Sequence, residues 1–407
     1  MRTIIPIASI TPQQPNVTAG PLASLPPLSL YVHFPWCAKK CSYCDFNSHE
    51  ARGGISQIPE AAYLAALIAD LEAALPQIWG RRIVSIFIGG GTPSLLSPGT
   101  LDKLLMAIRA RLQLLSDAEI TIEANPGAIE AGKFAAFRDA GITRISLGIQ
   151  SLDDRQLAAL GRIHSADEAR RAIDLAQRNF ANVNLDMMYA LPQQTLKAAQ
   201  HDIESAAAFG TPHLSAYHLT LEPNTPFHHA PPPLPDDDLA ADMQEMVEAT
   251  LAGRGYQNYE TSAFAQAGQR CTHNLNYWNF GDYLGIGAGA HGKISSPGGI
   301  AREARRRHPR DYLEAAASDD FLQERRTVGS AELPFEFMMN ALRLTEGFPL
   351  GMFEERTGLP LATQTAALMR AQQRGLLEVT AERITPTLHG RRFLNDLLQL
   401  FMSESAS

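Results

Sequence analysis

The sequence predicts an α/β fold: a partial (β/α)6 barrel followed by a mostly helical, winged-helix-like C-terminal domain. Six short apolar runs are separated by stretches whose apolar residues recur at helical spacing. Repeating strand–helix units form parallel sheets with right-handed crossovers. Six units fall short of the eight in a closed TIM barrel, so the barrel should stay open. Polar residues follow the predicted strands, where ligands bind in such folds.

The elements follow in chain order. The expected barrel strands are residues 28–34, 83–88, 119–124, 144–149, 182–188 and 214–219. The helices expected between them are residues 59–75, 101–114, 128–140, 166–178 and 196–209, with a further helix at 239–254. Beyond residue 332 the pattern predicts helices at 333–342, 350–356 and 361–374, a short hairpin, and a last helix at 391–402. Helices followed by a hairpin are typical of a winged-helix module.

Composition limits the function classes. The chain has 407 residues, of which 45% are hydrophobic, enough for one large domain and a smaller one. Its net charge of -8 argues against non-specific nucleic-acid binding. Only four cysteines occur, three of them in one loop, which fits a reducing compartment and a cytoplasmic location. No apolar run approaches the roughly 20 residues that span a bilayer. Residues 1–27 are rich in Pro, Thr, Gln and Ser and are predicted to be a flexible leader.

Cys37, Cys41 and Cys44 follow the first predicted strand with the spacing Cys-x3-Cys-x2-Cys. Three thiolates so close together can bind three irons of a 4Fe-4S cubane and leave the fourth iron open, whereas an electron-transfer ferredoxin supplies four cysteines. Two alternatives remain at this point. A zinc ion normally takes four ligands in a structural site, and His33 or His49 would have to complete the set. A disulfide would leave one of the three cysteines unpaired.

The residues around these cysteines carry a family resemblance. The pattern Tyr31-x-His33-x-Pro35-x-Cys37, continued by -x3-Cys-x2-Cys-x-Phe46, resembles the opening motif of radical S-adenosylmethionine (SAM) proteins of the coproporphyrinogen-oxidase-like branch. The likeness extends from about residue 28 to the C-terminal end. Within that branch the chain is similar to the heme chaperones. The oxygen-independent coproporphyrinogen III oxidases have a further cysteine two places after the third, where this chain has Phe46.

The resemblance implies a radical SAM fold, a 4Fe-4S cluster on the three loop cysteines, and a SAM site at the strand ends. Taken singly, each polar residue there is explained as well by a tight turn or by a buried group that its neighbours satisfy. Together they match the family's SAM-binding positions. The residues that the resemblance assigns to SAM are Tyr31, Phe46, Gly90, Gly91, Thr92, Glu123, Gln150, Arg162 and Asp186.

A second informative stretch runs from Cys271 to Trp278. By its residues alone it reads as a packed corner, with Asn capping a turn and Tyr and Trp in the core. It also matches the His-Asn-x-x-Tyr-Trp motif of the heme-chaperone relatives, so the resemblance implies a heme site. The residues concerned are His273, Asn274, Tyr277 and Trp278, with Cys271 and His291 as further candidate ligands. Gly285, Gly287 and Gly289 suggest a strand that a ligand approaches closely.

A leader, two domains and a linker are expected. After the leader come a radical SAM domain with its extension at residues 28–300, a linker at 301–330 and an accessory domain at 331–407 that the resemblance implies covers the open barrel face. The arginine-rich run 302–310 reads as a solvated helix face or linker, although such a run can also bind propionates, a partner or anionic lipid as a peripheral contact.

The sequence therefore favours a heme chaperone that binds a 4Fe-4S cluster, SAM and heme and passes heme to an acceptor heme protein. An electron donor would be needed if SAM is cleaved. The main alternative is an oxygen-independent coproporphyrinogen III oxidase, which Phe46 and the His273–Trp278 motif argue against. The third is a zinc-binding regulator with a winged helix. DNA binding is weakly supported, because the third helix of that module offers only Arg370 and Arg374 as cations.

Overall fold

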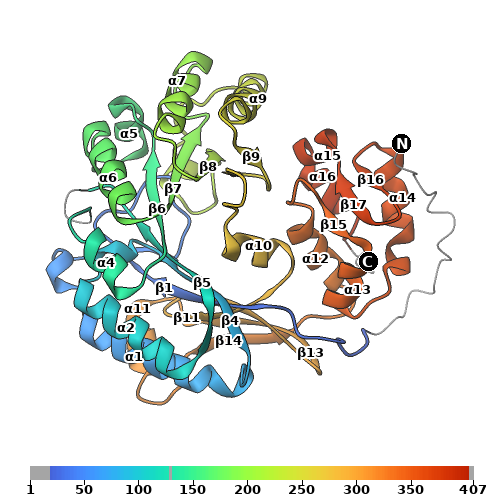
Figure 1. Cartoon of the computed structure of the whole chain (residues 1–407), viewed down its shortest axis with the longest axis horizontal. Helices are drawn as coiled ribbons and strands as arrows, with labels where there is room; N and C mark the ends of the chain where they lie inside the picture. Colours follow the sequence, from blue (N-terminus) through green and yellow to red (C-terminus); the bar gives the residue numbers. More distant parts are fainter. Residues whose placement is uncertain (1–18, 128–130, 403–407) are drawn as a thin grey trace.

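The computed structural model describes residues 19–127 and 131–402, and one 12-stranded sheet organises most of the chain (Figure 1). Its centre is six parallel strands that lie side by side in chain order. They are β1 (Leu28–Phe34), β4 (Arg82–Gly90), β5 (Gln113–Ala124), β6 (Arg144–Gln150), β7 (Asn182–Tyr189) and β8 (His213–His218). The predicted partial (β/α)6 barrel is confirmed.

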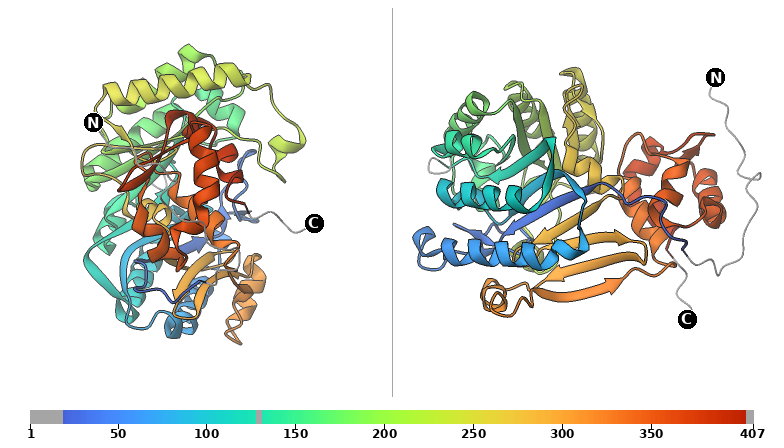
Figure 2. Two further views of the ribbon diagram at one scale, coloured as in Figure 1. Left: turned by 90° about the vertical axis from the view of Figure 1, so that its right-hand side faces the viewer. Right: turned by 60° about the horizontal axis from the view of Figure 1, so that its bottom comes forward.

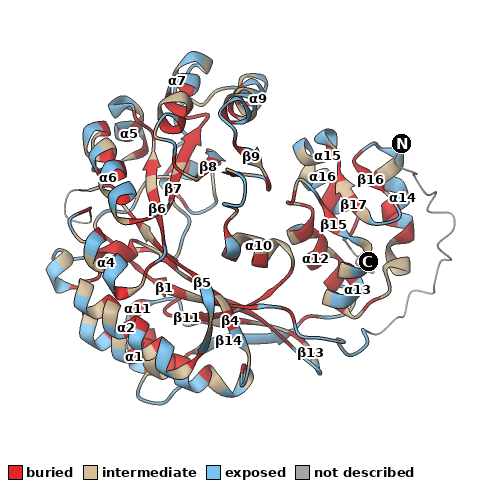
Figure 3. Cartoon of the chain, in the orientation of Figure 1, coloured by how far each residue is buried: buried red, intermediate tan, exposed pale blue. Residues whose placement is uncertain are grey.

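Helices cover the outer face of these strands, so the strands are buried on both sides (Figure 3). The covering helices are α1 (Glu60–Ala74), α2 (Pro98–Arg111), α4 (Phe134–Ala140), α5 (Asp154–Leu160), α6 (Ala166–Asn179), α7 (Leu196–Ala207) and α9 (Asp237–Gly253). Local signals explain their starts: the Ser165 side chain accepts from the Glu168 amide, and the Glu168 side chain closes a capping box. The first three residues of the helix expected at 128–140 lie outside the described residues.

An extension continues the sheet past β1. Strand β11 (Asp282–Ile286) pairs with β1 in parallel, and β12 (His291–Ser296), β13 (Gly299–Arg305) and β14 (Leu322–Thr327) follow as an antiparallel ribbon (Figure 2). At the opposite edge lie β10 (Ala263–Ala265) and β9 (Gln257–Asn258). The linker expected at 301–330 therefore differs from the structure, which puts β13, α11 (Pro309–Ala315) and β14 there.

Buried charge pairing explains this difference. Arg305 belongs to the run that reads as solvated, yet its side chain is 3% exposed. Its Nε donates to Asp70 Oδ1 on α1 at 2.8 Å and its Nη1 to Glu303 Oε2 at 3.0 Å. An arginine that has a partner on a helix far away in the chain cannot be told from a solvated one by local sequence.

The part of the expected leader that is described is held in place. The Gly20 amide donates to Gly358 O at 2.9 Å, and the Asp282 amide donates to Pro27 O at 2.9 Å. Arg81 Nη2 donates to Pro26 O at 2.6 Å. Residues 19–27 thus lie along the protein surface, in contrast to the expectation, and residues 1–18 lie outside the described residues.

The short helix α10 (Thr272–Trp278) lies inside the curve of the sheet, in contact with β1, β4 and β11 (Figure 1). It carries the motif that resembles a heme site. Tyr277 and Trp278, at its C-terminal end, line a cavity together with Gly90 of β4 and Glu123 of β5.

The C-terminal region has its own core around Phe337, Phe348 and Phe353, and it packs against Phe280 and Ile300 of the larger part. Its helices and strands are α12 (Leu333–Ala341), β15 (Phe348–Pro349), α13 (Leu350–Thr357), α14 (Thr365–Gln373), β16 (Leu377–Val379), β17 (Arg383–Pro386), α15 (Leu388–Arg392) and α16 (Leu394–Gln399). The antiparallel order β15-β17-β16 agrees with the winged-helix-like prediction. The last predicted helix is broken into α15 and α16 at Phe393, where ψ is 45°.

Among the described residues, none of the helices has the length and apolar character that crossing a membrane requires.

Candidate functional site

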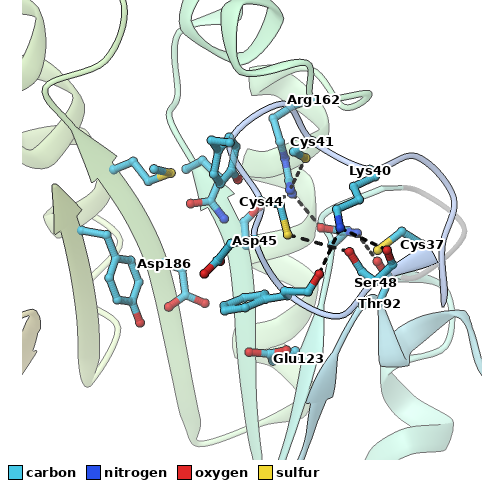
Figure 4. Close-up of a pocket in the computed structure, with 18 of the residues that line it drawn as sticks. Cys37, Lys40, Cys41, Cys44, Asp45, Ser48, Thr92, Glu123, Arg162 and Asp186 are labelled. Atoms are coloured by element: carbon cyan, nitrogen blue, oxygen red, sulfur yellow. Dashed lines mark hydrogen bonds between the residues drawn. The ribbon is translucent and has the colours of Figure 1, made fainter. Parts of the chain in front are cut away.

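The three predicted cluster ligands lie on the loop between β2 (Trp36–Cys37) and β3 (His49–Glu50), above the ends of the barrel strands (Figure 4). Cys37 is buried, Cys41 and Cys44 are partly buried, and all are free thiols. Burial raises the pKa values of the Cys37 and Cys44 thiols. Arg162 Nη1 donates to Cys41 Sγ at 3.5 Å, so a cation offsets part of the negative charge that thiolates would bring.

The geometry of the described residues gives no support to a zinc ion at the loop cysteines. Two sulfurs bound to one zinc ion at about 2.3 Å each cannot be farther apart than roughly 4.6 Å. Within residues 19–127 and 131–402, one group of three Cys, His, Asp or Glu side chains has ligand atoms that all lie within 4.8 Å of one another. This group is Glu119, Cys271 and His273, and it does not include the loop cysteines. His33 is also committed elsewhere: the Tyr31 hydroxyl lies 2.7 Å from its Nδ1, and its Nε2 lies 2.9 Å from Asn47 O.

A cavity of about 450 Å³ opens beside the cysteine loop. Eight of the nine residues assigned to SAM by resemblance line it together with the cysteines: Phe46, Gly90, Gly91, Thr92, Glu123, Gln150, Arg162 and Asp186. The ninth, Tyr31, lines a neighbouring cavity instead. The parallel strands explain the convergence, because their carboxyl ends meet at one edge of the sheet.

The glycine turn after β4 fixes the cysteine loop against the barrel. The Gly91 amide donates to Phe34 O at 2.7 Å and the Thr92 amide to Trp36 O at 2.8 Å. A Cβ on Gly91 would lie 2.5 Å from Trp36 O, so a larger residue would push the two segments apart. Gly90 has a φ of 114°, which favours glycine, and its amide donates to Glu123 Oε2 at 3.1 Å.

Two carboxylates face the cavity from neighbouring parts of the sheet (Figure 4). Burial, reinforced by the nearby charge of Asp186, raises the pKa of Glu123 to about 8. Burial also raises the pKa of Asp186, although the Ser146 hydroxyl donates to its Oδ2 at 2.8 Å. A cationic ligand would relieve this unfavourable burial of negative charge.

Arg162 connects the cysteine loop to the strand ends. Its Nη2 donates to Asn125 Oδ1 at 2.6 Å and to Gly148 O at 2.7 Å, in addition to the contact with Cys41. Gln150, at the end of β6, has a φ of 67°, which is uncommon for a residue with a side chain. Such strain is frequent at ligand sites.

The lining residues that sequence reasoning missed include Tyr43, Ser146 and Tyr217. Strand alternation could have indicated Ser146, because it is two residues before Gly148 and four before Gln150 on β6. Tyr43 and Tyr217 carry no comparable local signal.

The structure divides the expected heme residues. His273 is buried, its Nδ1 is 3.0 Å from Glu119 Oε1, and its ring centroid is 4.2 Å from that of Phe87. Asn274 Nδ2 donates to the Tyr259 hydroxyl at 3.4 Å. Neither His273 nor Asn274 belongs to the lining of the second cavity, which measures about 700 Å³ and is lined by Tyr277, Trp278 and His291 among others.

Cys271, the other candidate ligand on this motif, is fully buried and donates to Glu119 Oε1 at 3.4 Å. The accessory domain reaches the second cavity through Asn340 on α12, while the lining of the cavity beside the cysteines comes from residues 37–222. The accessory domain therefore lies at one side of the open barrel face and covers less of that face than the resemblance implies.

Comparisons with known proteins agree with this architecture. The sequence profile of the Radical SAM superfamily matches residues 31–206, and that of the HemN C-terminal domain matches residues 330–393. A solved structure described as "Coproporphyrinogen III oxidase (HemN) from Escherichia coli is a Radical SAM enzyme" superposes with a TM-score of 0.79 at 23% identity. That match covers 93% of this chain and 91% of the other, and it shows the shared fold.

Curated relatives are closer in sequence. The chain is 48% identical to "Heme chaperone HemW" of Escherichia coli (strain K12), across 94% of this chain and 100% of the relative. It is 47% identical to "Heme chaperone HemW" of Haemophilus influenzae, with the same coverage. The "Radical S-adenosyl methionine domain-containing protein 1, mitochondrial" of Bos taurus is 36% identical across 95% of this chain and 90% of that protein. The chain therefore belongs to the HemW family of the radical SAM superfamily.

Proposed function

We propose that this protein is a heme chaperone that binds a 4Fe-4S cluster, SAM and heme, and that delivers the heme to an acceptor heme protein. The observation that carries the proposal is similarity to relatives named heme chaperones over their whole length, 48% identity in the Escherichia coli case. That similarity includes both cavities and the C-terminal domain, so it is not limited to the cysteine motif that many radical SAM proteins share.

Cys37, Cys41 and Cys44 are the residues that would bind the cluster. They are free, they share one loop, and their sulfurs face a cavity rather than the core. Arg162 at Cys41 stabilises thiolate charge there. A bound cluster with one open iron would supply the electron that SAM-dependent radical chemistry needs.

The cavity beside the cysteines suits SAM. Glu123 and Asp186 supply carboxylates for the cationic and hydroxyl groups of the ligand, and Arg162 supplies a cation for its carboxylate. Gly90 and Gly91 leave room for close approach of the backbone to the ligand. The role of each residue toward SAM is part of the proposal.

We also propose a cytoplasmic location, because four free thiols fit a reducing compartment. Heme and an acceptor heme protein are the expected partners, with an electron donor if SAM is cleaved. The excess of acidic residues gives no support for nucleic-acid binding.

A second function, oxygen-independent coproporphyrinogen III oxidation, is kept as the alternative because the fold is shared with the coproporphyrinogen III oxidase structure. Fold alone does not determine function. Phe46 occupies the position at which the oxidases carry their additional cysteine, and it lies between the two cavities, lining both.

The test is anaerobic reconstitution of the full chain with iron and sulfide, followed by hemin titration and by incubation with an apo-heme protein. We expect cluster absorbance, saturable hemin binding and transfer of heme to the acceptor faster than from free hemin. Failure of the reconstituted protein to bind hemin would contradict the proposal. Turnover of coproporphyrinogen III would favour the alternative.

A further inference from the structure

A second cavity, of about 700 Å³, lies on the other side of Phe46 from the cysteines. The two cavities share Asp45, Phe46, Gly90 and Glu123 in their linings, so they are neighbours with the Phe46 ring between them. Phe46 is 59% exposed, which is unusual for a large apolar side chain beside a buried site. The size lies in the range of pockets that bind cofactor-sized molecules.

Aromatic rings form one side of this cavity. Tyr31 and Phe87 lie parallel, with centroids 5.9 Å apart and planes at 17°, and Tyr277 meets Tyr283 edge-on at 4.9 Å. Trp278 is fixed from behind by Arg343, whose Cζ is 4.3 Å from its ring centroid. Held rings of this kind favour a flat, largely apolar ligand.

One imidazole at this cavity is available to bind iron. His33 uses both nitrogens, with the Tyr31 hydroxyl and Asn47 O as partners. His291 at the start of β12 is exposed, and within the described part of the chain no hydrogen bond to its ring is found. His273 lies outside the cavity lining, and its ring nitrogens are next to Glu119 and Cys271.

One end of the rim of this cavity carries a positive charge that suits a ligand with carboxylates. Arg307 is exposed and lines the cavity, whereas Arg302 nearby is already paired with Glu336 at 2.8 Å. Glu324 lines the rim as well, so a ligand with carboxylates would turn them toward Arg307. The accessible rim of the cavity suits a molecule that must be released as well as bound.

We propose that heme binds in this second cavity, with His291 as an axial ligand and Arg307 as the partner of a propionate. The assignment rests on the proposed heme-chaperone function and deepens it. Tyr277 and Trp278 then contact the ring, as the sequence motif implies, while His273 positions α10 through Glu119.

The test is a hemin titration of the reconstituted full chain, followed by Soret absorbance, for His291→Ala, His273→Ala and the matched control His229→Ala. His229 is an exposed imidazole in α8 (Pro226–His229), outside both cavity linings. Loss of an outer-shell partner costs a metal site roughly tenfold in affinity, and loss of a ligand should cost at least that. We expect such a loss and a shifted Soret band in His291→Ala, reversal of the shift by added imidazole, and no change in His229→Ala.

A second pair of variants tests the propionate contact. Arg307→Gln should weaken hemin binding severalfold, whereas Arg310→Gln removes the same charge from an exposed residue outside this cavity and should leave binding unchanged. Wild-type affinity and spectrum in His291→Ala, with loss in His273→Ala, would overturn the assignment and place the ligand on the sequence motif. Hemin binding that survives both histidine substitutions would overturn it too. Absence of hemin binding in the wild type would instead contradict the proposed function itself.

Discussion

Glu123 and Asp186 are the two carboxylates that face the candidate SAM cavity, and their burial determines its charge at neutral pH. The pKa of Glu123 is raised to about 8 by burial first and by Asp186 second, while the Gly90 amide and Arg144 oppose the shift. Glu123 is therefore mostly protonated near neutral pH in the absence of a ligand. An incoming cation would favour its ionised form.

This shift predicts how stability depends on pH. Because the folded pKa of Glu123 exceeds its ordinary value of 4.5, its contribution to stability is complete at acid pH and is lost as pH rises toward 8. Glu123→Gln removes that dependence. Between pH 5.5 and pH 8.5 we expect the free energy of unfolding of the variant to rise by about 1–2 kcal/mol relative to that of the wild type, after solvent screening is taken into account. Urea unfolding of the two cluster-free proteins measures this difference. Parallel curves of unfolding free energy against pH for the wild type and the variant would contradict the prediction.

The cysteines give a second prediction. Cys37→Ala, Cys41→Ala and Cys44→Ala should each lose the absorbance and iron of the reconstituted cluster, because each removes one of three protein ligands. Cys271→Ala is the control, since its sulfur is buried beside Glu119 and away from the loop. Iron analysis of each variant after anaerobic reconstitution measures whether the cluster is present. Cluster loss in Cys271→Ala together with retention in Cys41→Ala would refute the assignment.

Single residues also show where sequence reasoning reaches its limit at the site. The family resemblance identified the glycines, the carboxylates and Arg162, and the parallel barrel explains why they meet, because it brings the strand ends together. Tyr31 was assigned to SAM but lines the second cavity, and the Phe46 ring lines both cavities. No local pattern reveals on which side of that ring a side chain lies.

Among the elements, α1 and β13 are joined by an ion pair buried under the sheet extension. Arg305 Nε donates to Asp70 Oδ1 at 2.8 Å, and Asp70 Oδ2 accepts from the Tyr312 hydroxyl at 2.8 Å and from the Gly287 amide at 3.1 Å. Burial raises the pKa of Asp70, and Arg305 opposes that shift. The carboxylate thus depends on its partner to stay ionised.

We predict that Arg305→Met lowers the free energy of unfolding by about 3–5 kcal/mol, because it leaves a buried carboxylate without its counter-charge. Arg310→Met is the matched control. Its pair with Glu314 is exposed, so the change in the free energy of unfolding should be much smaller than for Arg305→Met. Urea denaturation compares the two, and equal small effects would show that the buried pair contributes little.

The six barrel strands were predictable because each is an apolar run buried on both faces. The ribbon of β12 to β14 was not. Its strands carry Lys293, Glu303 and Arg305, which look solvated in sequence but are buried in ion pairs. The pair of Arg305 with Asp70 joins segments far apart in the chain. The break at Phe393 between α15 and α16 likewise has no glycine or proline to announce it.

At the level of the whole molecule, the two cavities and the accessory domain must be considered together. The cavity beside the cysteines and the aromatic cavity meet at Phe46, and Asn340 brings the C-terminal domain to the rim of the second. A molecule in the aromatic cavity would therefore lie next to a molecule bound beside the cysteines, with Phe46 at the boundary of the two cavities. The chain shares its fold with the coproporphyrinogen III oxidase structure, and the fold alone does not decide whether it supports that reaction.

The last prediction concerns that reaction. We expect no coproporphyrinogen III oxidase activity from the reconstituted full chain with SAM and a strong reductant, because Phe46 stands where the oxidases carry a cysteine and its ring lies between the two cavities. Iron content and SAM cleavage should be measured on the same sample, so that an empty cluster site is not mistaken for absent activity. Porphyrin products are followed by fluorescence after oxidation. Formation of protoporphyrinogen IX in amounts stoichiometric with SAM consumed would show that the cavities communicate during turnover, and the chain would then act as the oxidase.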